Sequence, residues 1–97
     1  MFEHLFDTLF LVSLLNEQID VRSTDRGHPA KFTWRGHTFR VRRIIGDWPA
    51  RPGAPGVPAT HIHLLRVSAE SETGHPSIID ISRDAASDRW TMRRQWG

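Results

Sequence analysis

Hydrophobic and polar residues alternate over most of the chain after residue 17, and this period of two is typical of half-buried β-strands. Turns rich in Gly, Pro, Asp and Ser separate the alternating or short apolar segments. The segments cover residues 18–22, 30–34, 38–45, 60–70, 77–84 and 89–96. Their spacing predicts an antiparallel meander of about five to six strands that forms a half-barrel or small barrel.

The beginning of the chain follows a different pattern. Phe2, Phe6 and Leu9 recur at helical spacing, and two nearby acids suit the positive N-terminal end of a helix. We therefore predict a helix over 2–15 that covers an open end or face of the sheet. The apolar run "LFLVSLL" also fits a strand, which is the alternative.

The composition is that of one small globular domain, since 38% of the 97 residues are hydrophobic and 25% are charged. The expected fold class is α+β, mainly β, with the N-terminal helix in 1–16 and the antiparallel β domain in 17–97. Residues 46–59 hold four prolines and three glycines, so we expect a loop there.

The stretch "FTWRGHTFRVRR" at 32–43 predicts a hairpin that turns around Arg35-Gly36. Phe32 and Phe39 face the same side only if the connection has two or four residues, and a two-residue turn places them opposite each other. Alternation fails at "RRII" (42–45), where two apolar residues follow two basic ones. We expect a β-bulge or a strand end at that point.

Positive charge is concentrated in this hairpin and in the last strand, although the net formal charge is only +2. Residues 1–30 contain five acids and two arginines, whereas residues 31–51 contain six bases and one acid. A sheet with aligned cations can contact phosphates. The candidate nucleic-acid-binding residues are Lys31, Arg35, Arg40, Arg42, Arg43, Arg89 and Arg93. The alternative is that these side chains only keep the outer face of the sheet soluble.

A protein-interaction surface is the other hypothesis, because the N-terminal segment is more apolar than a small domain requires. Tryptophan is also enriched among the residues that dominate binding energy at interfaces. The candidate interface residues are Phe2, Phe6, Leu9, Phe10, Trp48 and Trp96. We expect a protein partner or a second copy of the chain, with nucleic acid as the alternative partner. The competing interpretation of the apolar segment is a buried cap.

Metal chemistry has one weak candidate. His61 and His63 lie on one face of a predicted strand and could hold a metal ion if His37 or His75 supplied a third ligand. A chain with six histidines produces such a pair by chance fairly often, so we expect no metal and no cofactor. There are no cysteines, which excludes disulfides and thiolate sites and favours a reducing, cytoplasmic location.

Motifs for catalysis are not evident either. The serines lack a nucleophile-elbow context, and the only glycine-rich loop carries prolines where amide donors would be needed. We therefore expect neither an enzyme nor a small-molecule substrate. The apolar N-terminal run is too short to cross a membrane and lacks the basic flank of a signal peptide, so no membrane partner is expected.

Two stretches carry a family resemblance: "FTWRGHTFRVRRIIGDW" and "SIIDISRDAASDRWTMRRQW". They resemble the small actinobacterial domain DUF6504, which combines a Trp-Arg-Gly hairpin with a tryptophan-containing ending, and the resemblance covers residues 18–96. The order of motifs is also similar to the C-terminal region of ImuB-type proteins, the inactive Y-family polymerase homologues of a mutagenic DNA-repair system. The resemblance implies an adaptor associated with DNA repair, with no catalytic residues to carry over. Phe39 stands where the family usually has Tyr, and the polymerase-like body is absent from this sequence.

Overall fold

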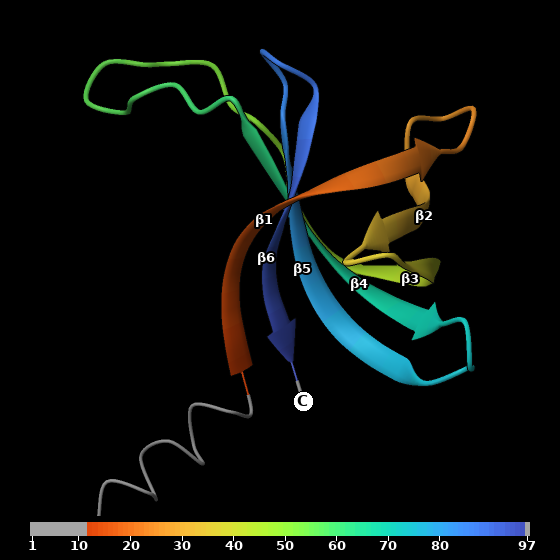
Figure 1. The fold of residues 1–97 in the computed structure, drawn as a ribbon. Helices are drawn as coiled ribbons and strands as arrows, with labels where there is room; N and C mark the ends of the chain where they lie inside the picture. Colours follow the sequence, from red (N-terminus) through yellow and green to blue (C-terminus); the bar gives the residue numbers. More distant parts are fainter. Residues whose placement is uncertain (1–11, 97) are drawn as a thin grey trace, which may run out of the picture.

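The computed structural model describes the backbone of residues 12–96 and the side chains of residues 15–96. Six antiparallel strands follow one another around a closed barrel, and the first strand pairs with the last (Figure 1). The strands are β1 (Val12–Ser23), β2 (Pro29–Trp34), β3 (His37–Trp48), β4 (Ile62–Ser71), β5 (Pro76–Asp84) and β6 (Arg89–Trp96). Closure leaves no open sheet edge, which removes the unpaired backbone groups that would otherwise invite aggregation.

The α+β prediction with an N-terminal helix is wrong, because residues 12–96 contain no helix and form an all-β barrel. Residues 12–15, which we predicted to end the helix, belong to β1, and the rest of that prediction lies outside the described residues. Val12 pairs with Trp96, and Leu14 pairs with Arg94. The strand alternative was correct here because pairing with β6, which closes the barrel, decides the conformation of a short apolar run.

The hairpin of β2 and β3 confirms that Phe32 and Phe39 share a face, and its connection is the shorter of the two lengths that their parity allows. Arg35 and Gly36 form a two-residue turn, and their φ angles of 51° and 77° are both positive, as a type I′ turn requires. Phe32 therefore lies opposite Phe39, and the two rings stack in the core with centroids 5.1 Å apart.

The predicted bulge in "RRII" is also confirmed. The register between β3 and β4 shifts once between Val41 and Arg43 and again between Ile44 and Gly46. The extra residue lets Val41 and Ile44 both pack against the core although they are three positions apart. Gly46 to Trp48 still belong to β3, so the predicted loop at 46–59 began too early.

The connection between β3 and β4 projects from the barrel (green in Figure 1) and contains only two isolated bridges, Arg51 with Thr60 and Ala54 with Val57. The core fills the barrel with ten buried apolar side chains. They are Ile19, Phe32, Phe39, Leu65, Val67, Ala69, Ile79, Ile81, Trp90 and Met92. Within residues 12–96 there is no helix of the length and hydropathy needed to cross a membrane.

Candidate functional site

The outer surface of β3 to β6 carries an aromatic face, which we define by Trp48, Leu64, Arg66, Ile78, Asp80 and Trp96. The side chains next to these along β4 and β5, such as Leu65 and Ile79, are buried in the core, so strand alternation directs the face outward. Trp48 is 47% exposed and Ile78 is 40% exposed.

The ring of Trp48 lies over the glycine two residues before it. A Cβ atom built on Gly46 would lie 2.6 Å from the Trp48 ring and 3.2 Å from the Cβ of Arg66. The indole therefore occupies the space that a side chain at Gly46 would fill, and it lies next to Arg66 on the neighbouring strand.

An ion pair lies at the centre of the aromatic face. Arg66 donates two hydrogen bonds to Asp80, from Nε to Oδ1 at 2.8 Å and from Nη2 to Oδ2 at 3.2 Å. Asp80 is only 4% exposed, while the side chain of Arg66 keeps 34% of its surface exposed. The hydrogen bonds to Asp80 raise the pKa of Arg66 above its ordinary value. The pair is thus charged and bidentate, which fixes the orientation of the guanidinium group.

The same guanidinium lies between two tryptophans. It is 4.8 Å from the centroid of the Trp96 ring and 5.7 Å from that of Trp48, and Arg94 stacks on Trp96 at 5.1 Å. Cation–π contacts of this kind add to the ion pair and orient both rings. An open depression of about 610 Å³ lies beside them, with apolar walls from Ile62 and Leu64.

A second feature lies on the outer surface of β1, β2 and β3, where three cations stand side by side. Arg22 is the cross-strand partner of Lys31, and Lys31 is the partner of Arg40. All three side chains are exposed. We call this set the cationic row. Glu70 of β4 continues the row, but its carboxylate is paired with Arg42 at 3.4 Å.

Some of the predicted nucleic-acid-binding residues lie in the cationic row, and others contact acids or polar groups of the protein itself. Lys31 and Arg40 belong to the cationic row. Arg35 makes a bidentate pair with Glu17 at 3.0 and 2.6 Å and stacks on Trp34. The hydrogen bonds raise the pKa of Arg35 and lower that of Glu17.

The other predicted cations lie apart from the row. Arg93 donates a hydrogen bond to Asn16 at 3.0 Å, Arg89 is the strand partner of Asp84, and Arg43 is exposed opposite Ser68. The sequence reasoning missed Arg22 in the row. The alternation in "QIDVR" (18–22) places Arg22 on the polar face of a strand. The strand that pairs with these residues was not predicted, so the contact with Lys31 could not be foreseen.

Of the predicted interface residues, Trp48 and Trp96 are brought together on either side of Arg66. The other four, in the N-terminal segment, lie outside the described residues. Arg66 and Asp80 were missed as members of this face. The sequence feature that could have identified them is a charged residue between apolar neighbours in each of two predicted strands, because alternation places such a residue on the outer surface.

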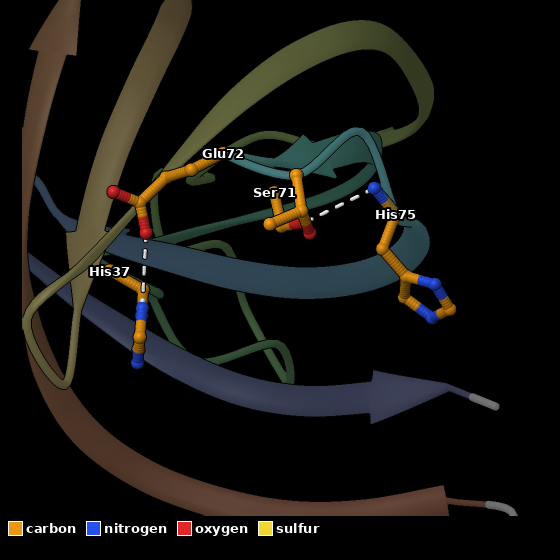
Figure 2. Close-up of polar contacts among 5 residues, drawn as sticks. His37, Ser71, Glu72 and His75 are labelled. Atoms are coloured by element: carbon orange, nitrogen blue, oxygen red, sulfur yellow. Dashed lines mark hydrogen bonds and ion pairs between the residues drawn. The ribbon is translucent and has the colours of Figure 1, made fainter.

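The histidine pair does not assemble a metal site. His63 contacts Asp47 at 2.5 Å, whereas His61 is exposed just before β4. At the far end of β4, His37 contacts Glu72 at 3.0 Å, and the ring of His75 points away from this pair (Figure 2). Within the part of the chain that the structure describes, no three His, Asp or Glu side chains are placed to hold a metal ion.

The chain was compared with known protein families, curated proteins and solved structures. The family model for a domain of unknown function, DUF6504, matches residues 1–97. The chain belongs to this family. The match includes the N-terminal segment, which the sequence resemblance had left out. No curated protein and no solved structure matches this DUF6504 domain.

Proposed function

We propose that the domain is a non-enzymatic interaction module that binds a protein partner through the aromatic face. The observation that carries the proposal is the exposed Trp48, whose ring lies over Gly46 and beside the guanidinium of Arg66. Tryptophan and arginine are the residues most enriched among interface hot spots, and a side chain that is ordered before binding loses little entropy on binding.

The partner that suits this face is an acidic and apolar peptide segment. The open depression contains three arginines, at positions 66, 93 and 94, and one acid, Asp80, which is already paired with Arg66. Ile62 and Ile78, both about two-fifths exposed, add apolar surface around them. Charge complementarity favours carboxylates opposite the unpaired arginines, and the apolar surface favours aliphatic or aromatic side chains.

The wider role that we propose is that of an adaptor associated with DNA repair. This part rests on the similarity of the hairpin and the last two strands to the C-terminal region of ImuB-type proteins. A module that presents an exposed tryptophan to its partner is compatible with such a role.

The test is selection of peptides from a random display library against the wild-type domain, followed by calorimetry with the selected peptides. We expect acidic, apolar peptides that bind at least about 30-fold more weakly to Trp48→Ala, as hot-spot truncation implies. Val57→Ala is the matched control, because Val57 is 53% exposed but lies on the projecting loop.

Two results would contradict the proposal. One is that the selected peptides bind Trp48→Ala as tightly as the wild type. The other is a dimer in sedimentation analysis that Trp48→Ala dissociates, which would identify a second copy of the chain as the occupant of the face.

A further inference from the structure

The cationic row is an arrangement that the fold itself does not favour. Neighbouring strands lie about 4.8 Å apart, and directly opposed side chains have Cβ atoms roughly 5 Å apart. Arg22, Lys31 and Arg40 therefore place three positive charges next to one another across three strands. Like charges that are directly opposed destabilise a sheet. A contribution to folding stability therefore does not explain why three cations stand together in the row.

The acids near the row form no ion pair with it, although Glu70 is the cross-strand partner of Arg40. None of its three side chains takes part in an ion pair within residues 15–96. Glu70 is engaged with Arg42, and Glu72 is engaged with His37. Asp20 lies in the next row, opposite Thr33. The positive potential of the row is thus available to a ligand.

The surface beside the row is hollowed and offers hydroxyl groups. A depression of about 560 Å³ toward β1 is lined by Arg22, Lys31, Thr33 and Thr38, with Asp20 as its one acid. A depression of about 250 Å³ toward β4 is lined by Lys31, Thr38 and Arg40 and also by Glu70 and Glu72, the two acids that pair with Arg42 and His37. Threonine hydroxyls and basic side chains are common donors to the phosphates of nucleic acids.

We propose that the cationic row binds the sugar-phosphate backbone of double-stranded DNA. Three cations across three strands span roughly 10 Å, and one strand of a duplex carries a phosphate every 3.4 Å or so along its axis. The row can therefore face about three successive phosphates. This surface is separate from the aromatic face, so the inference does not depend on the proposed partner binding.

The duplex is preferred to a single strand because the row offers no base-stacking surface. The aromatic rings nearest to it in the hairpin, Phe32 and Phe39, are 1% and 7% exposed and lie in the core. Proteins that bind single strands rely on exposed aromatic rings that stack on unpaired bases. A contact made only with phosphates positions the protein without reading sequence.

The experiment is fluorescence anisotropy with a labelled DNA duplex of about 20 base pairs, long enough to cover the row several times. Three phosphate contacts predict a slope of about −2.7 for log affinity against log salt, or a loss of about 500-fold when salt rises from 20 to 200 mM. The variant Arg22→Ser/Lys31→Ser/Arg40→Ser is expected to bind at least about tenfold more weakly at 20 mM salt.

The matched control is Arg26→Ser/Arg51→Ser/Arg89→Ser. It removes three exposed arginines elsewhere, so the net charge changes by the same amount. We expect it to keep the affinity within about threefold and to keep the salt slope. All six positions are exposed, and a thermal melt of each variant verifies that the barrel is folded.

Three results would overturn the inference. The first is the absence of duplex binding by the wild type at 20 mM salt. The second is an equal loss of affinity in the row variant and the control, which would indicate a response to net charge alone. The third is binding of the single strand as tightly as the duplex. Peptide binding by the row variant is measured in parallel. Because this variant leaves the aromatic face unchanged, its peptide affinity tests the proposed partner binding independently of DNA binding.

Discussion

On the aromatic face the central arginine forms an ion pair within the protein, whereas none of the three cations of the cationic row forms one within residues 15–96. Arg66 is paired with the buried Asp80 and stacked between two tryptophans. Lys31 has a cation on each side and no acid partner within the described residues. The contrast separates charge that stabilises the fold from charge that remains free for a ligand. Substitutions should therefore change stability in opposite directions at the two places.

The largest effect is expected from Asp80→Asn, which removes the carboxylate from a nearly buried, bidentate ion pair. A hydrogen-bonded charge of this kind contributes about 1.5–3 kcal/mol, so we expect the free energy of unfolding to fall by about 2 kcal/mol. That change corresponds to a melting temperature roughly 8–16 °C lower for a domain of this size.

The control for Asp80→Asn is Asp88→Asn, which breaks the exposed pair with Arg83. We expect a loss of at most about 1 kcal/mol there. Equal losses in the two variants, measured by thermal and urea denaturation, would show that the ion pair of the aromatic face is not structural.

A smaller effect of opposite sign is expected from Lys31→Gln. Removing the middle charge of the cationic row relieves repulsion on both sides, so the free energy of unfolding should rise by about 0.5 kcal/mol at low salt. The gain should vanish in 1 M salt, where the Debye length is about 3 Å. Lys31→Arg keeps the charge and should show no gain. A destabilised Lys31→Gln protein at low salt would contradict the view that the row is unfavourable for folding.

Gly46→Ala should disturb the aromatic face with little change in stability. The new methyl group displaces the Trp48 ring, which loses a cation–π contact of about 0.5–1 kcal/mol. Replacing a glycine inside a strand offsets this by a similar amount. The measurement is the chemical shift of the Arg66 Nε proton, which should move toward its value in Trp48→Ala. In the Trp48→Ala background the Gly46 substitution should move that shift much less, since only the contact of the new methyl group with the Cβ of Arg66 remains, and an equal change in both backgrounds would contradict the geometry.

The smallest effect concerns the exposed pair of Glu17 and Arg35. The folded state lowers the pKa of Glu17 from 4.5, so the carboxylate stabilises the fold above that pH. This contribution is lost as the pH falls through the lower pKa of the folded state. The melting temperature of Glu17→Gln should therefore be slightly below that of the wild type at pH 7, and the difference should shrink as the pH is lowered below 4.5. The difference should be absent when Arg35→Gln is present in both proteins, and a difference that does not shrink on acidification would contradict the assignment.

The hairpin shows how much of the fold could be predicted from local pattern. The parity of Phe32 and Phe39 limited the connection to two or four residues, and the failure of alternation at 42–45 located a bulge. The start of β1 could not be predicted in the same way. The apolar run near Val12 is compatible with both a helix and a strand. It forms a strand because it pairs with β6, which lies more than 75 residues later in the chain.

The two faces show the same limit for the site. Trp48 and Trp96 were predicted as interface residues, but their meeting through Arg66 depends on pairing across four strands. Lys31 and Arg40 were predicted from the hairpin alone. Arg22 joins them only because the turn after β1 sets the register of Arg22 opposite Lys31, and a turn of that length does not fix a register from sequence.

The pairing of Val12 with Trp96 brings the two ends of the described chain to adjacent positions on the barrel. A closed ring of strands has no privileged first member, and the projecting loop between Trp48 and Ile62 is exposed along most of its length. The barrel formed by residues 12–96 is therefore suited to circular permutation, with a linker joining Trp96 to Val12 and new termini in that loop. Such a permuted protein would keep the aromatic face and the cationic row. Its termini would lie in the loop between β3 and β4 instead of beside the paired ends of β1 and β6.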